Sequence, residues 1–302
     1  TVSSRFLNSG TVEIRGSSLS LTGPSQLGGE IVLDPTDSLS PTAATLSVGG
    51  TQGVEHLFKN LSFTGLAPSD SGSSARAVFG RGDYKLEGTI SSTSAAVSEF
   101  VSIHAERGNW INEESAQFDF AESLPLLFGS DNLEPNFQVG APLENLGYLQ
   151  IDRASITGSG TFKNSGSIIT RRLSVGSGSA TGKFVNEGSF TVEGGAFPFV
   201  EIIDGSLYTN RDTFVLSDNA RIQSPFSATE ATFVNEGLFQ GAESNRGKQV
   251  NLIYKQSGDG SAKTEALSGT LSFKRKAEFE NGRLDVSSLI VFEDAVEWGK
   301  AD

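Results

Sequence analysis

The chain of 302 residues contains no cysteine and no methionine, and it has only two histidines. Without thiols it can form no disulfide, no cysteine-bound zinc site and no thiol nucleophile. His56 and His104 stand far apart in the chain with no cluster of ligands beside them, so the sequence has no transition-metal motif. The lack of methionine indicates that Thr1 is not a translation start. We therefore expect a processed or excised piece of a larger exported protein.

Long apolar runs and excess positive charge are also missing. The longest apolar clusters, at 124–128 and 289–292, are far below the roughly 20 residues of a membrane helix. The 23 Lys and Arg stand against 36 Asp and Glu, which gives a net charge of −13. This balance argues against nucleic acid and anionic membranes as partners, since both need a basic surface. We expect an extracellular or cell-surface protein with no membrane insertion.

Glycine and phenylalanine are abundant. The chain has 35 Gly but only 9 Pro, together with 21 Phe. A disordered glycine-rich chain would lack aromatic residues, so these glycines are expected to mark turns in an ordered fold.

One short motif recurs: an aromatic residue, any residue, Asn, any residue, Gly. Looser versions begin with Leu, carry Gln in place of Asn, or lack the Gly at the fifth position. The members are Phe6-Asn8-Gly10, Leu143-Asn145-Gly147, Phe162-Asn164-Gly166, Phe184-Asn186-Gly188, Tyr208-Asn210, Phe233-Asn235-Gly237, Tyr254-Gln256-Gly258 and Phe279-Asn281, with Phe58-Asn60 and Trp110-Asn112 as degenerate candidates.

The spacing of the motif indicates a solenoid. From 143 onward its first residues fall at 143, 162, 184, 208, 233, 254 and 279. A variable step of about 22 residues suits coils of strands and turns, because the turns can absorb insertions. Short alternating apolar and polar runs such as 11–15 and 189–193 follow the motifs and read as strands.

Stacking explains each residue of the motif. Coils about 4.8 Å apart place equivalent side chains directly above one another. Phe would then stack on Phe in the core, Asn would bond to Asn in an amide ladder, and Gly would allow the corner to turn. The predicted fold is all-β: a single right-handed parallel β-helix over 1–302, whose hand follows the general rule for parallel crossovers. We expect regular coils over 141–302 and less regular coils with larger loops over 24–140.

These motifs and their trailing strands resemble the repeats of large bacterial surface proteins, namely filamentous haemagglutinin-type adhesins and autotransporter passenger domains. The resemblance covers the motifs at 6–10 and 143–282, about half of the chain. It implies a right-handed β-helix displayed outside the cell.

Candidate chemistry is sparse. Asp204, Asp212 and Asp218 fall close together in sequence, and Glu113-Glu114 follow Trp110; such carboxylates on adjacent coils could cleave a polysaccharide, although solvated turn acids are the simpler interpretation. Asp131-Asn132 and Asp218-Asn219 could offer oxygens to calcium, and no other cofactor is expected. Arg81-Gly82-Asp83 matches the integrin-binding tripeptide but also reads as a tight turn.

The sequence therefore favours a non-enzymatic structural or adhesive module, a rigid stalk or a self-associating fibre subunit. Its expected partners are further copies of itself, stacked end to end, or adjoining regions of a larger surface protein, because solenoid ends carry unpaired strand edges. The alternative is a carbohydrate-binding or polysaccharide-cleaving β-helix with glycans as partners. An ice-binding solenoid ranks lower, since Thr191 and Thr209 form no Thr-x-Thr row in the sequence.

Overall fold

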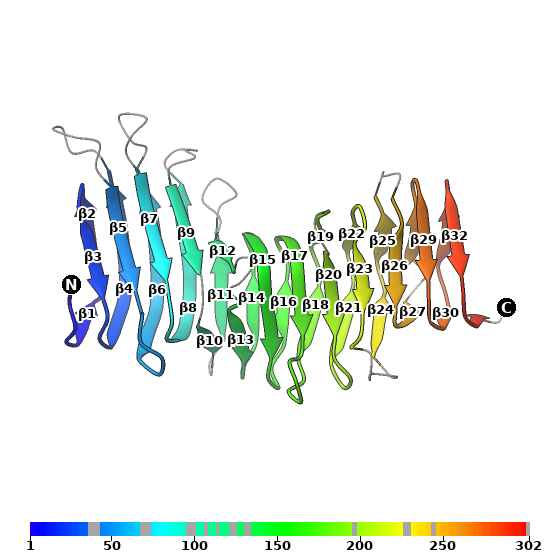
Figure 1. Cartoon of the computed structure of the whole chain (residues 1–302), viewed down its shortest axis with the longest axis horizontal. Coiled ribbons are helices and arrows are strands. Elements are labelled where there is room, and N and C mark those ends of the chain that lie inside the picture. The colour runs from blue at the N-terminus through cyan, green and yellow to red at the C-terminus, as the bar shows by residue number, and fades with distance from the viewer. Residues whose placement is uncertain are drawn as a thin grey trace. The chain divides into compact units, whose positions relative to one another are not determined.

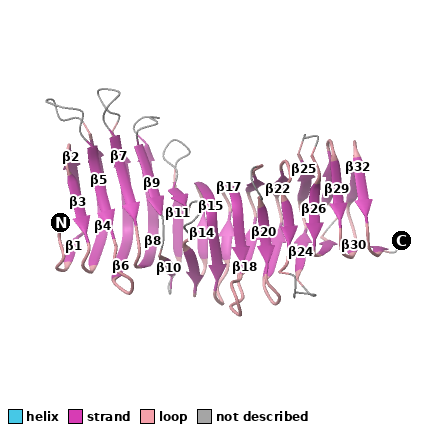
Figure 2. Cartoon of the chain, in the orientation of Figure 1, coloured by secondary structure: helices cyan, strands magenta, loops and turns pink. Residues whose placement is uncertain are grey.

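The structure, a computed structural model, describes residues 1–35, 43–66, 74–94, 101–105, 108–112, 115–120, 126–129, 134–194, 198–225, 231–242, 246–258 and 260–299. Within these ranges the chain contains strands and turns but no helix, and so no helix that could cross a membrane (Figure 2). The chain divides into two compact units, Thr1–Ala154 (unit 1) and Ser155–Asp302 (unit 2). Both are parallel β-solenoids, which confirms the predicted fold class; the right hand and the single domain over 1–302 stay predictions.

Unit 1 is built from strands that pair with one another in parallel (Figure 1). Its strands are β1 (Phe6–Asn8), β2 (Thr11–Arg15), β3 (Ser18–Leu21), β4 (Ser25–Asp34), β5 (Ala43–Val48), β6 (Glu55–Gly65), β7 (Ser74–Phe79), β8 (Asp83–Ser94), β9 (Val101–Ala105), β10 (Asn109–Asn112), β11 (Ala116–Asp119), β12 (Leu126–Phe128), β13 (Asn136–Val139), β14 (Leu143–Asn145) and β15 (Tyr148–Thr157), the last of which contains the unit boundary.

Long strands that bend at a bulge form the corners of unit 1. β1 and β2 both pair with β4, and β10 and β11 both pair with β8, so each long strand spans two sides of the coil. The register shifts between Gly28 and Gly29 in β4, and around Asn60 in β6. Asn60 has a φ of 47°, a left-handed conformation that Asn tolerates at a bend.

The register of unit 1 shows where each coil repeats. One position of the coil is occupied in turn by Ser25, His56, Tyr84, Trp110 and Phe137. The distance along the chain between these residues is the length of one coil, and it is greater than the step predicted from the motif.

Unit 2 has shorter strands and shorter coils. Its strands are β16 (Phe162–Asn164), β17 (Ser167–Val175), β18 (Lys183–Asn186), β19 (Ser189–Val192), β20 (Phe199–Ile202), β21 (Leu207–Asn210), β22 (Thr213–Leu216), β23 (Arg221–Gln223), β24 (Thr232–Asn235), β25 (Leu238–Gly241), β26 (Lys248–Asn251), β27 (Ile253–Gln256), β28 (Lys263–Ala266), β29 (Thr270–Phe273), β30 (Ala277–Phe279), β31 (Arg283–Val286), β32 (Leu289–Phe292) and β33 (Val296–Trp298).

Three strands make each coil of unit 2. From β18 to β30 every strand pairs in parallel with the third strand after it, for example β18 with β21, β19 with β22 and β20 with β23. Successive coils place the same position at Phe162, Phe184, Tyr208, Phe233, Tyr254 and Ala277. The first five are first residues of the motif, so the coils of this unit have the length that the motif spacing predicts.

Candidate functional site: side-chain ladders and the last coil

Four buried asparagines form a hydrogen-bonded amide ladder in unit 2. The Nδ2 atom of each donates to the Oδ1 atom of the next: Asn164 to Asn186 at 2.7 Å, Asn186 to Asn210 at 2.8 Å, and Asn210 to Asn235 at 2.8 Å. All four side chains are fully buried. The parallel register causes this contact, because it places each Asn on the Asn of the coil before it. We call these four residues the amide ladder.

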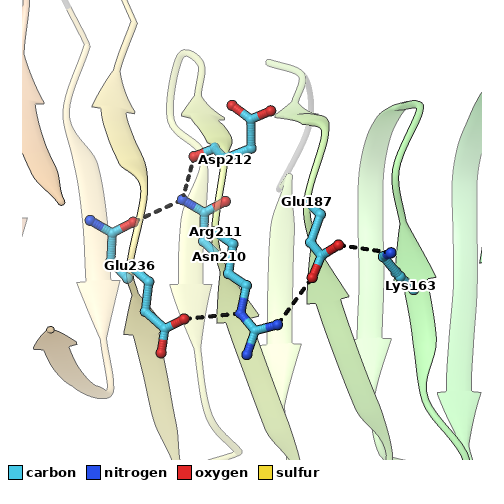
Figure 3. A network of polar contacts seen from close by, with 7 residues as sticks. Lys163, Glu187, Asn210, Arg211, Asp212 and Glu236 are labelled. Carbon is cyan, nitrogen blue, oxygen red and sulfur yellow. Dashed lines mark hydrogen bonds and ion pairs between the residues drawn. The ribbon is translucent and has the colours of Figure 1, made fainter. Parts of the chain in front are cut away.

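The same amide groups close the corner that follows each strand. Asn186 Nδ2 also donates to the carbonyl of Gly188 at 2.8 Å and to that of Thr213, in the next coil, at 2.9 Å. Asn210 Nδ2 repeats this pattern, since it donates to the carbonyl of Asp212 at 3.0 Å (Figure 3). It also donates to the carbonyl of Leu238, in the next coil, at 3.0 Å. Each Asn therefore adds a side-chain donor to backbone carbonyls at the corner, and those of Gly188 and Asp212 also accept from backbone amides of the next coil.

Close backbone approach explains the glycine of the motif. A Cβ atom on Gly188 would lie 2.2 Å from the carbonyl oxygen of Gly166, and one on Gly237 would lie 2.4 Å from that of Asp212. No side chain fits at such a distance. Neither Gly188 nor Gly237 has a positive φ, so the expected conformational role of Gly is replaced here by a steric one.

The amide ladder ends at Asn235, and the residue opposite Asn235 in the next coil is Gln256. Its Oε1 accepts from Thr264 Oγ1 at 2.6 Å, and its Nε2 donates to the carbonyl of Asn281 at 3.0 Å. The prediction that Asn281 continues the ladder is wrong. The partner of Gln256 in the next coil is Phe279, so the Phe279-Asn281 motif lies two residues out of register and the Asn281 side chain is exposed.

Stacked aromatic side chains fill the core beside the amide ladder. Phe162, Phe184, Tyr208, Phe233 and Tyr254 lie one above another, with ring centroids 4.9 to 6.0 Å apart. Burial raises the pKa of Tyr208 and of Tyr254 above that of a free phenol. A second row, Phe190, Phe214 and Phe239, has spacings of 5.1 and 5.5 Å. Sequence reasoning missed this row, although each member stands six residues after a member of the first.

Among the described residues of unit 1, the strand register places no motif Asn opposite another Asn of the unit. Asn8 is half-buried opposite Leu27, and its Nδ2 donates to the carbonyls of Gly10 and Gly28. In the other two motifs the partner of the Asn is apolar: Asn112 lies opposite Val139, and Asn145 lies opposite Phe118.

The interpretation of Phe58-Asn60 as a motif is wrong. Phe58 is opposite Leu27 and Leu86, and Asn60 forms the bulge. Phe6 occupies an inward position of its coil opposite Ser25, where it is half-buried.

The candidate catalytic and calcium-binding acids are spread over separate turns. Asp204 precedes β21, Asp212 lies between β21 and β22, and Asp218 lies between β22 and β23. Among the residues that the structure describes, no three His, Cys, Asp or Glu side chains gather as a metal site would require. Glu113-Glu114 and Asp131-Asn132 lie outside the described residues. Asp218-Asn219 forms a turn in which Asn219 has a φ of 58°.

His56 is a core residue. Its side chain is fully buried, stacks on Tyr84 at 5.3 Å, and pairs through Nδ1 with Ser25 Oγ at 2.7 Å. Burial lowers its pKa, against a smaller opposing effect of Asp83. The side chain of His104 lies outside the described residues. Arg81-Gly82-Asp83 lines a surface hollow of about 360 Å³, where Asn109 Nδ2 donates to Asp83 Oδ1 at 2.8 Å.

A row of alternating charges follows the outer surface beside the amide ladder. Lys163 pairs with Glu187 at 2.8 Å, and Arg211 bridges Glu187 at 3.0 Å and Glu236 at 2.9 Å (Figure 3). Hydrogen bonds from Lys163 and then Arg211 lower the pKa of Glu187. These side chains are partly exposed, so the row stabilises the coils only modestly.

The last coil of unit 2, β31 to β33, leaves apolar side chains uncovered. These strands pair with β28, β29 and β30, and within the described ranges no strand lies on their other side. Val286 and Trp298 continue the inward-facing positions of Ala266 and Phe279, yet they are 54% and 58% exposed. Trp298 stacks on Phe279 at 4.6 Å, so its other face is open.

The first coil of unit 1, β1 to β3, also has inward-facing apolar side chains that are incompletely buried. Phe6, Val12 and Leu19 face inward, because their partners Ser25, Ile31 and Leu46 do, but all three are only half-buried. Strand edges with open backbone groups and adjoining apolar side chains can accept another strand.

No protein-family model, curated protein or solved structure matches the chain. The resemblance to bacterial surface repeats therefore rests on the motifs and on the parallel solenoid itself.

Proposed function

We propose that this chain is a non-enzymatic structural or adhesive module displayed outside the cell, a stalk or fibre subunit that stacks through its last coil. The observation that carries this proposal is the last coil, where Val286 and Trp298 extend the core beyond its covered part. The cover that best fits such a coil is another parallel β-coil, since it would pair the edges of β31, β32 and β33 and bury their inward side chains.

The proposed occupant is the first coil of a second copy. Its half-buried Phe6, Val12 and Leu19 would meet the apolar side chains of the last coil. Such a head-to-tail contact joins two different surfaces, so it can repeat without closing and build a filament. In a protein of the adhesin type, an adjoining coil of a larger precursor would occupy the same position.

Light scattering over a range of concentrations tests the proposal. We expect the average mass of the wild-type chain to rise with concentration, and Val286→Glu and Trp298→Glu to suppress the rise because each places a charge in the contact. Leu207→Glu is the matched control, since Leu207 is 42% exposed on β21, away from the last coil. A wild-type chain that keeps the monomer mass at every concentration, or variants that associate as the wild type does, would contradict the proposal.

A further inference from the structure

Two arginines without ionic partners share one pocket in unit 2. The pocket has a volume of about 290 Å³, and its lining includes Glu201, Arg221, Gln223, Asn251 and Arg275. Among the described residues, neither guanidinium makes an ion pair, although the chain carries 36 acidic residues. Guanidinium groups bind carboxylates and other oxyanions through paired hydrogen bonds, so this pair favours an anionic ligand.

The solenoid register builds the rest of the pocket. Glu201, Gln223 and Asn251 occupy the same position in three successive coils, on β20, β23 and β26. Their side chains therefore form a polar row with the spacing of strands, about 4.8 Å. Arg221 stands two residues before Gln223 on the same side of β23, and Arg275 lies in the turn between β29 and β30.

The polar row suits hydroxyl groups. Gln223 Nε2 donates to Glu201 Oε1 at 3.2 Å, which leaves Oε2 of this carboxylate as an acceptor. Asn251 Oδ1 is buried and has no hydrogen-bond donor among the described residues. A buried acceptor without a donor is costly, and a ligand hydroxyl seated on the row would supply one.

Glu201 also restricts the charge of the ligand. A second negative charge on the ligand would be repelled by this carboxylate, so a phosphate, which carries between one and two negative charges at neutral pH, fits less well than a single carboxylate. One carboxylate for the two arginines and neighbouring hydroxyls for the polar row describe an acidic sugar. The pocket volume is near the lower end for small-molecule sites, which matches one sugar unit.

We propose that this pocket binds the carboxylate and hydroxyls of an acidic sugar, such as a uronic acid. This inference names a ligand for the adhesive part of the proposed function, and it does not depend on stacking through the last coil.

Titration calorimetry of the full chain with sodium D-glucuronate, D-glucose and inorganic phosphate tests the inference. We expect glucuronate to bind at least about tenfold more tightly than glucose or phosphate, because only glucuronate satisfies both the arginines and the polar row. Arg221→Gln and Arg275→Gln should each weaken glucuronate binding about tenfold. Lys183→Gln, which removes a positive charge from an exposed position of β18 outside the pocket, should leave it unchanged.

A second variant separates an acidic-sugar site from a general anion site. Glu201→Gln should reduce the preference for glucuronate over phosphate, since it removes the repelling charge. Equal binding of phosphate and glucuronate by the wild type, or glucuronate binding that survives both arginine substitutions, would overturn the inference. Light scattering on the same samples distinguishes this failure from a failure of stacking, because the two involve different residues.

Discussion

The two units make the corners of their coils in different ways. In the coils of unit 1 that contain β4 and β6, a long strand bends through a bulge, at Gly28-Gly29 and at Asn60. In unit 2 the strand stops, and a buried Asn from each coil bonds to the Asn and the corner carbonyls of the next. The difference shows that the corner of a parallel solenoid can be a bend within one continuous strand, or a break between two strands where side-chain amides add to the backbone hydrogen bonds between coils.

The units also differ in coil length and charge. One coil of unit 1 runs from His56 to Tyr84, whereas one coil of unit 2 runs only from Phe184 to Tyr208. Unit 1 holds 8 Lys and Arg against 18 Asp and Glu, whereas unit 2 holds 15 against 18, so the net charges are −10 and −3. The more balanced charges of unit 2 form rows along its coils, such as the row bridged by Arg211.

Among the substitutions that test this comparison, one in the amide ladder should destabilise the fold most. Asn210→Leu removes four hydrogen bonds and takes one partner each from the buried amide groups of Asn186 and Asn235. We expect it to lower the free energy of unfolding by about 3 kcal/mol or more. Asn60→Gly in unit 1 should cost less than about 1 kcal/mol, because Gly readily adopts the positive φ and only one bond, from the amide of Thr89, is lost.

Urea denaturation of the full chain measures both variants against the wild type. If Asn210→Leu and Asn60→Gly destabilise the chain equally, the corner at Asn210 in unit 2 does not depend on its side-chain amide more than the corner at Asn60 in unit 1 does.

Substitution of a glycine of the motif should give the next largest loss of stability. Gly188→Ala would force a Cβ atom against the carbonyl of Gly166, so we expect a loss of about 1–3 kcal/mol or more. Gly10→Ala, at the same place of the motif in unit 1, meets nothing within 4 Å and should be nearly neutral. Thermal unfolding monitored by circular dichroism compares the two, and a similar loss in both would rule out the steric role assigned to Gly188.

Of the three features, the row of charges should contribute least to the free energy of unfolding. Arg211→Gln removes the bridge between Glu187 and Glu236, and its cost should be at most about 1 kcal/mol in low salt and smaller in about 1 M NaCl. A loss that is independent of salt would assign Arg211 a packing role instead.

Acid should weaken this row and also the separate contacts of Glu265 with Gln240 and Lys263. The pKa values of Glu187 and Glu265 are lowered in the folded state, Glu187 chiefly by its hydrogen bond from Lys163 and Glu265 by that from Gln240. Their contribution is therefore complete above the unfolded pKa of about 4.3 and is lost as the pH falls through the lower folded values. Glu187→Gln should flatten this part of the stability profile between about pH 5 and 3, as measured by urea denaturation at each pH. If the free energy of unfolding of Glu187→Gln falls with pH as steeply as that of the wild type, Glu187 does not cause this pH dependence.

The sequence predicted the fold and the ladder positions from 162 to 254, because there each coil carries one motif in the same register. It failed where a coil departs from that pattern. Gln256 and Thr264 take over hydrogen bonds at the end of the ladder, and Phe279 then lies two residues away from the position that its motif suggests.

Unit 1 shows a second feature that the sequence does not predict. A bulge such as that at Asn60 shifts the register by one residue and leaves no trace in the spacing of motifs. The arginine pocket could not be predicted either, since Arg221 and Arg275 are brought together only by the stacking of coils.

Negative-stain electron microscopy of the concentrated wild-type chain, with and without calcium, tests the stacking of coils most directly. The account predicts filaments whose subunits join head to tail, and predicts that Trp298→Glu abolishes them. Discrete single particles of the wild-type chain at every concentration, in both conditions, would contradict it.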